Sequence, residues 1–213
     1  MQTPDKLLEQ WLAEADGLIF DCDGTLVDTM PSHYHAWSTV LASYGCTFPE
    51  SDFYHLGGMP MAKIVARLNE EQGLSIPVQA AVAKKVDFYL AHSPTLQPIG
   101  PVAAIARRFH GKKPIAVASG GSRQLVSHSL ASAGLTSLFE VVVTSEDVEH
   151  GKPAPDTYHL AAERLGLQAR NCLVFEDAPT GIASAEAARA RCVEVGVVAK
   201  EGEREFHLRP RAD

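Results

Sequence analysis

Two aspartates stand directly behind a short apolar run near the start of the chain. Residues 18–20 are uninterruptedly apolar, which is typical of a buried strand, and Asp21 and Asp23 follow at a spacing of two. On an extended backbone, residues two apart point the same way, so both carboxylates start on one side. Carboxylates crowded at a strand end repel each other unless a positive group, commonly a divalent cation, lies beside them.

This run predicts a site for Mg²⁺ and a phosphate, with Asp21 as nucleophile and Asp23 as the group that donates and accepts a proton. Gly24 permits a sharp turn and lets backbone N–H groups approach an anion. The alternatives are a calcium-binding loop and an exposed turn. The chain lacks the longer Asp/Asn series of an EF-hand loop here, and the apolar strand favours the edge of a sheet.

Two further segments carry groups that suit a phosphate. Ser119 closes the apolar run 115–118 and precedes two glycines, so a hydroxyl and loop N–H groups come together there. The alternative is an ordinary turn followed by a helix cap. Lys152 stands in a loop that Pro153 and Pro155 make rigid, where a cation can neutralise a phosphate and a nucleophilic carboxylate. The alternative for Lys152 is a solvated surface residue.

An acidic pair ends a later apolar run. Glu176 and Asp177 follow residues 172–175, and a hard divalent cation with oxygen ligands fits such a pair. The alternative is an exposed acidic turn that caps the next helix. In parallel sheets, ligands bind beyond the carboxyl ends of the strands, so the polar residues behind each apolar run should converge at one edge. These residues are Asp21, Asp23, Ser119, Thr144, Ser145, Glu176 and Asp177.

The element pattern predicts an α/β protein with a Rossmann-like doubly wound parallel sheet and an inserted, small all-helical cap domain. We expect strands at 18–20, 114–119, 141–144, 172–176 and 192–195, separated by helices at 100–110, 122–133, 155–165 and 179–190. A short helix at 3–14 precedes the first strand. Helices from 31 to about 44, at 60–72 and at 77–92 interrupt this alternation. We therefore expect a catalytic core of residues 1–29 and 96–213 and a helical cap of residues 30–95.

Composition excludes several other classes of protein. The 213 residues are 46% hydrophobic and carry a net charge of −7, which provides no electrostatic footprint for nucleic acid or an acidic membrane. The four cysteines are scattered, and no apolar run reaches the length of a membrane span. We expect no signal peptide, a cytoplasmic location, and a solvated, partly disordered tail after Lys200. We expect a monomer, with a weak homodimer as the alternative.

Four motifs in order resemble those of the haloacid dehalogenase superfamily. They are Asp21-x-Asp23-Gly24-Thr25, Ser119, Lys152-Pro153-x-Pro155 and Glu176-Asp177. The helical block after the first motif, and the run DTMPSHYHAW at 28–37, resemble the β-phosphoglucomutase-like branch. Within it, the chain is most similar to sugar-phosphate phosphatases of the fructose-1-phosphatase type. The resemblance spans about residues 16–196.

The resemblance implies a role for each motif. Asp21 would attack phosphorus and form an aspartyl-phosphate, while Asp23 would protonate the leaving alcohol and then activate water. The implied Mg²⁺ ligands are Asp21, the carbonyl of Asp23, Glu176 and Asp177. The implied phosphate-binding residues are Asp21, Cys22, Asp23, Ser119, Gly120 and Lys152. The cap would exclude water, with substrate contacts from Thr29, His33, Gly57, Gly58, Lys84 and Arg123.

The sequence departs from the mutases of this branch at one place that affects the expected reaction. Mutases of this branch carry an arginine in the cap loop that binds a second phosphate, whereas residues 57–61 read GGMPM. Hydrolysis of a small phosphorylated metabolite, such as fructose 1-phosphate, is therefore the favoured function. The alternatives are a β-phosphoglucomutase-type mutase, in which Arg123 or Lys63 partly replaces that arginine, and a catalytically inactive phosphate-binding module.

Overall fold

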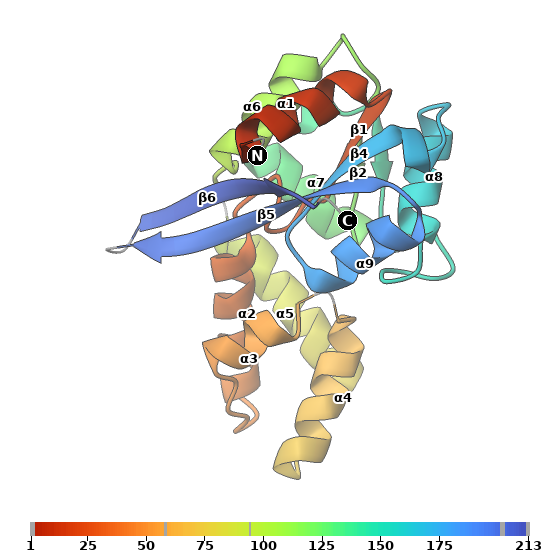
Figure 1. The fold of residues 1–213 in the computed structure, drawn as a ribbon. Coiled ribbons are helices and arrows are strands. Elements are labelled where there is room, and N and C mark those ends of the chain that lie inside the picture. Colours follow the sequence, from red (N-terminus) through yellow and green to blue (C-terminus); the bar gives the residue numbers. More distant parts are fainter. Residues whose placement is uncertain (1–2, 58, 94, 201–202, 212–213) are drawn as a thin grey trace.

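The described strands form one sheet that confirms the predicted fold class. The computed structural model describes residues 3–57, 59–93, 95–200 and 203–211 (Figure 1). Its strands are β1 (Gly17–Phe20), β2 (Ile115–Ala118), β3 (Val141–Val143), β4 (Cys172–Glu176), β5 (Arg191–Lys200) and β6 (Glu203–Pro210). They lie in the order β3-β2-β1-β4-β5-β6, and all neighbours are parallel except β5 and β6. The chain therefore winds outward from β1 in both directions, as a doubly wound sheet does.

The strand register brings the carboxyl ends of the central strands to one level. Phe20 pairs with Val117 of β2 and with Phe175 of β4. Because parallel strands end at the same edge, the residues that follow these partners lie side by side. Asp21, Ser119 and Glu176 consequently meet at this edge.

Helices cover both faces of the sheet, and alternate residues of β1 face different layers. Leu18 and Phe20 belong to a core with α1 (Pro4–Glu14), α6 (Gly100–Phe109) and α7 (Arg123–Ser132). Ile19 belongs to a second core with α8 (Asp156–Arg164) and α9 (Pro179–Ala187). All of β1 is buried, which explains its continuous apolar run.

A helical block extends beyond the sheet (Figure 1). It consists of α2 (Met30–Ala42), α3 (Glu50–His55), α4 (Met61–Gln72) and α5 (Val78–His92), and it has its own apolar core around Trp37, Phe53 and Val65. The two chain segments that lead into and out of the block pair with each other, since the Asp28 N–H donates to Gln97 O at 2.9 Å. The short helix α3 was not predicted individually.

The predicted solvated tail is wrong for residues 203–210. These residues form β6, which pairs along its length with β5. Phe206 and Leu208 pack against the core beside α1 and α6, and their spacing of two is a strand signal that the interleaved charges conceal. Arg204 on β6 also lies 3.3 Å from the Asp28 carboxylate and donates to the Tyr54 hydroxyl of α3 at 3.3 Å. No helix among the described residues is long and apolar enough to cross a membrane.

Removal of the Phe20 ring tests the central packing of the sheet. The ring is fully buried, stacks on Phe175 with centroids 4.9 Å apart, and contacts Phe139 edge-on at 5.9 Å. We expect Phe20→Ala to lower the free energy of unfolding by about 3–5 kcal/mol in urea titrations, because it leaves a cavity. Val198→Ala, at a side chain that is 42% exposed, should change it by at most about 0.5 kcal/mol. Equal losses in the two variants would contradict this packing.

Candidate active site

A buried lysine joins two of the predicted acidic groups. Lys152, in the segment between β3 and α8, donates from Nζ to Asp21 Oδ1 and to Glu176 Oε1, both at 2.7 Å. Burial opposes the charge of Lys152, but these two carboxylates outweigh it and raise its pKa well above the usual value. Lys152 is therefore a fixed cation between two strand ends.

Neighbouring groups fix the Glu176 carboxylate. Tyr158 OH donates to Glu176 Oε1 at 3.2 Å, and the Ala178 N–H donates to Oε2 at 2.7 Å. Gly181 of α9 packs so closely that a Cβ there would lie 1.7 Å from Glu176 Oε1. Glu176 thus has little freedom to turn away from Asp21.

Asp177 completes an acidic cluster that can hold a metal ion. Thr25 Oγ1 donates to Asp177 Oδ1 at 2.8 Å. Gly24, with φ +85°, passes so close that a Cβ would lie 2.3 Å from Asp177 Oδ2. Ligand oxygens of Asp21, Glu176 and Asp177 lie within 4.8 Å of one another, and this all-oxygen donor set fits a hard divalent cation.

Burial makes these carboxylates hard to ionise together. It raises the pKa of Asp21 to about 7. The charge of Lys152 opposes this rise, and the charge of Glu176 adds to it. Burial likewise raises the pKa of Asp177 well above its ordinary range, and Glu176 and Asp21 raise it further. A bound cation would relieve both effects, because an opposite charge nearby favours the ionised forms. The donor set therefore fits the metal that the sequence predicts.

The Asp23 side chain lies outside this cluster and meets the helical block instead. His33 Nε2, on α2, is 3.5 Å from Asp23 Oδ1, and Lys85 Nζ, on α5, is 2.7 Å from His33 Nδ1. A charged lysine makes Nδ1 an acceptor, so Nε2 carries the hydrogen that points toward Asp23. The Tyr89 ring stacks on His33 with centroids 4.1 Å apart, which holds the imidazole in place.

These contacts decide the charge of Asp23. Burial alone would raise its pKa, but His33 and Lys85 hold the pKa below the usual value. Burial and Lys85 lower the pKa of His33, and burial lowers the pKa of Lys85 to about 8. The ionised form of Asp23 is therefore favoured.

A loop from β2 lies beside Asp23. We call residues 119–122 the serine loop and residues 150–155 the lysine loop. Ser119 is 1% exposed, and its Oγ accepts from the Gly121 N–H at 3.0 Å. A Cβ on Gly121 would lie 3.3 Å from both Asp23 Oδ2 and Ser119 Oγ. Gly121 of the serine loop thus packs against the proposed proton-transfer group, whereas Gly120 is exposed.

Two of the predicted substrate contacts, Lys84 and Arg123, are exposed. Lys84 is exposed and lies over the Tyr44 ring, with Nζ 4.9 Å from its centroid, whereas its neighbour Lys85 points inward. Ala81, Lys85 and Tyr89 share the buried face of α5 at the helical spacing of four, and that spacing could have identified Lys85. Arg123 is exposed and forms an ion pair with Asp147, so its charge is already matched.

The other predicted contacts are placed as follows. Thr29 is fully buried at the start of α2, and its Oγ1 has no hydrogen-bond partner among the described residues. Gly57 is half-buried after α3, and Gly58 lies outside the described residues. Thr25, which belongs to the first motif but was given no role, contacts Asp177. Tyr158, which contacts Glu176, was missed, because a single tyrosine has no spacing signal.

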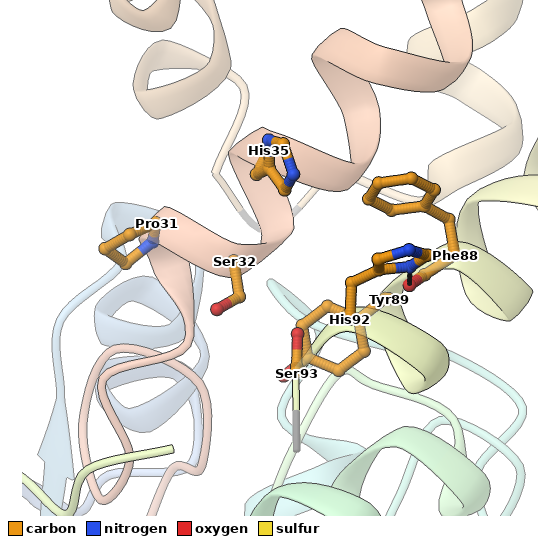
Figure 2. Close-up of a pocket in the computed structure, with 7 residues that line it drawn as sticks. All are labelled: Pro31, Ser32, His35, Phe88, Tyr89, His92 and Ser93. Atoms are coloured by element: carbon orange, nitrogen blue, oxygen red, sulfur yellow. Dashed lines mark hydrogen bonds between the residues drawn. The ribbon is translucent and has the colours of Figure 1, made fainter. Parts of the chain in front are cut away.

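A separate pocket of about 180 Å³ lies where α2 begins and α5 ends (Figure 2). Phe88 stacks on His92 with centroids 3.9 Å apart and meets His35 edge-on at 5.3 Å. Tyr89 is the one lining residue that also touches His33. The lining residues include none of the acidic residues and not Lys152, so this pocket is distinct from the acidic site. They are Pro31, Ser32, His35, Phe88, Tyr89, His92 and Ser93.

The fold is that of an α/β protein with a cluster of carboxylates at the carboxyl edge of its parallel strands. The model of the haloacid dehalogenase-like hydrolase family matches residues 15–189, and the chain belongs to this family.

Named relatives narrow the enzyme class. Fructose-1-phosphate phosphatase YqaB of Escherichia coli K12 is 37% identical over 180 residues, which cover 84% of this chain and 95% of that protein. Hexitol phosphatase A of the same organism is 31% identical over 183 residues, covering 86% and 84%. The chain is accordingly a phosphatase of this family.

Solved structures share the fold. CbbY from Rhodobacter sphaeroides in complex with phosphate superposes with a TM-score of 0.74 at 22% identity over 84% of each chain. A putative β-phosphoglucomutase from Thermotoga maritima superposes with a TM-score of 0.69 at 26% identity over 88% of each chain.

The raised pKa of Asp21 predicts how the stability of metal-free protein depends on pH. Between the ordinary value near 3.8 and about 7, the folded chain binds more protons than the unfolded chain, so the free energy of unfolding falls as pH rises through this window. We expect melting temperatures in EDTA to fall from about pH 5 to about pH 8, and to fall less in Asp21→Asn, whose amide cannot ionise. A divalent cation should raise the wild-type value at the higher pH.

The exposed Asp87 on α5 provides the control, because Asp87→Asn changes a carboxylate far more open to solvent. Its pH dependence should follow that of wild type. If the melting temperatures of Asp21→Asn and Asp87→Asn depended on pH in the same way, the inference that buried charge is crowded at Asp21 would be refuted.

Proposed function

We propose that the chain is a Mg²⁺-dependent phosphatase that hydrolyses a small sugar phosphate, such as fructose 1-phosphate, through an aspartyl-phosphate on Asp21. The observation that best supports this function is the position of the Lys152 ammonium, which lies 2.7 Å from both Asp21 and Glu176. Asp177 lies beside these two carboxylates. This arrangement offers a carboxylate nucleophile, a cation for the phosphoryl group and an acidic metal site in one place. The names of the two relatives, a fructose-1-phosphate phosphatase and a hexitol phosphatase, support the substrate class.

Asp21, Glu176 and Asp177 would hold Mg²⁺, and the main-chain carbonyl of Asp23 is the further ligand that we propose. When bound, the ion would supply positive charge that screens the carboxylates and stabilises the negative charge of the transferring phosphoryl group. The metal would also permit Asp21 to stay ionised and therefore nucleophilic.

In the first step, an oxygen of Asp21 forms a bond to phosphorus while the bond from phosphorus to the sugar oxygen breaks. The leaving alcohol takes its proton from Asp23. Lys152, the Ser119 hydroxyl and the N–H groups of Cys22 and Gly120 would bind the phosphoryl oxygens. In the second step, Asp23 takes a proton from water, which attacks phosphorus and releases Asp21 and inorganic phosphate.

The contacts of Asp23 fit its second role directly. His33 and Lys85 favour the ionised carboxylate, which is the form that accepts the proton of the attacking water. The first step needs the protonated form, which is favoured when the contact with His33 loosens. Movement of the helical block relative to the core would therefore alter the proton affinity of Asp23.

We further propose that residues 30–95 act as a cap inserted into a catalytic core of residues 1–29 and 96–213. The block contributes His33 from α2 and Lys85 from α5 to the acidic site, so its position affects the chemistry directly. Closure over a small substrate would exclude water from the phosphoryl group until the alcohol has left.

Phosphate release from a panel of phosphorylated sugars tests this function. We expect turnover that needs Mg²⁺, is abolished by EDTA, and is highest for small sugar phosphates such as fructose 1-phosphate. Asp21→Asn should reduce kcat by at least about 10³-fold, because the amide cannot attack phosphorus. Conversion of β-glucose 1-phosphate to glucose 6-phosphate as the main reaction would indicate a mutase instead. Absence of turnover on every substrate would indicate an inactive phosphate-binding module.

Two adjacent lysines offer a matched test of the contact between the cap and Asp23. We expect Lys85→Met to lower kcat/KM on the order of tenfold, since it removes the cation that orients His33 toward the proton-transfer group. Lys84→Met makes the same chemical change on the exposed face of α5 and should stay within about twofold of wild type. Steady-state kinetics with thermal melts of both variants would separate catalysis from folding. Equal kinetics in the two variants would exclude a role for Lys85.

A further inference from the structure

A half-buried carboxylate occupies the middle of the segment that connects β3 to the lysine loop. Asp147 Oδ2 accepts from the Thr144 N–H and from Thr144 Oγ1, both at 2.8 Å, and from Arg123 of α7. Asp147 Oδ1 accepts from Arg164 of α8 at 3.0 Å. The Asp147 side chain is 13% exposed, whereas the side chains of its partners Arg123 and Arg164 are 45% and 39% exposed.

The same segment supports the serine loop. The Ser145 N–H and Ser145 Oγ both donate to Gly121 O at 3.1 Å, and the Arg123 N–H donates to Glu146 Oε1 at 3.0 Å. These bonds attach the end of the serine loop to the two residues that precede Asp147. The position of Asp147 therefore fixes where the serine loop lies.

The serine loop in turn packs against the reacting groups. A Cβ on Gly121 would be 3.3 Å from Asp23 Oδ2 and from Ser119 Oγ, so the backbone at Gly121 leaves no gap beside either group. Lys152 lies five residues after Asp147 in the same segment. A shift of Asp147 would thus displace groups on both sides of the phosphoryl site.

Asp147 stays ionised at any working pH. Burial alone would raise its pKa, but the Thr144 hydroxyl and amide and the two guanidinium groups hold the pKa at about 2. Both arginines therefore have a permanent anion between them. Arg123 starts the helix after the serine loop, and Arg164 ends the helix after the lysine loop.

We propose that Asp147 is a positioning residue for phosphoryl transfer, which sets the serine loop against the lysine loop through Thr144, Arg123 and Arg164. This inference rests on the proposed phosphatase function. It assigns Arg123 to the support of the serine loop instead of to the substrate. Because Asp21, Glu176 and Asp177 come from other strand ends, the metal site should not depend on Asp147.

The test compares phosphate affinity with metal affinity in the full chain. With p-nitrophenyl phosphate as substrate, Asp147→Asn should raise KM and the inhibition constant of inorganic phosphate by about tenfold, since one charged hydrogen-bond acceptor is lost. The Mg²⁺ concentration for half-maximal activity should stay within about twofold of wild type. Thr144→Val should shift phosphate affinity in the same direction, and Thr144→Ser, which keeps the hydroxyl, should restore it.

Glu14→Gln is the matched control, because it breaks an ion pair similar in length to that between Asp147 and Arg164. This control pair joins Glu14 to Arg191, 2.7 Å away, where β5 begins. It should leave phosphate affinity unchanged. If Asp147→Asn or Thr144→Val lowered the melting temperature without changing the phosphate inhibition constant, Asp147 would serve the fold alone and the inference would be overturned. Should Asp147→Asn not fold, the Thr144 pair decides the question. Absence of Mg²⁺-dependent turnover in wild type would overturn both this inference and the proposed function.

Discussion

The active site depends on one cation held among three carboxylates. Lys152 lies 2.7 Å from Asp21 and from Glu176, and Asp177 adds a third acid within 4.8 Å. One lysine cannot neutralise three buried carboxylates, so the site keeps an excess of negative charge that a divalent ion would balance. The rest of the site preserves this crowding, since Tyr158, Thr25 and the close-packed glycines at 24 and 181 stop the acids from turning apart.

The two aspartates of the opening turn serve different parts of the molecule. Asp21 faces the acidic cluster of the core, whereas Asp23 faces His33 and Lys85 of the helical block. Their spacing of two places them on neighbouring strand-end positions, but their charges are set by separate surroundings. Burial and Glu176 raise the pKa of Asp21, and His33 and Lys85 of the helical block help to lower that of Asp23. Such a division lets two chemically identical side chains do different work.

Most of the sheet and the core motifs were predictable because they rest on local patterns. Apolar runs ended by polar residues located β1, β2 and β4, and parallel strand ends converge by geometry. The strand β6 was missed because Phe206 and Leu208 stand among charges. The inward direction of Lys85 was not predicted, because the phase of a helix face depends on what packs against it. The ion pair between Arg123 and Asp147 was not predicted either, because the two residues are distant in sequence and only the fold brings them together.

The match to the family model ends at residue 189, and the β5–β6 hairpin lies beyond it. Arg204 of that hairpin reaches Asp28, in the linker before α2, and Tyr54, within the helical block. Rotation of the block about its paired linkers must therefore either pull Tyr54 away from the Arg204 guanidinium or bend the hairpin with it. The β5–β6 hairpin is thus a third connection between the sheet and the helical block, beside the two paired linkers.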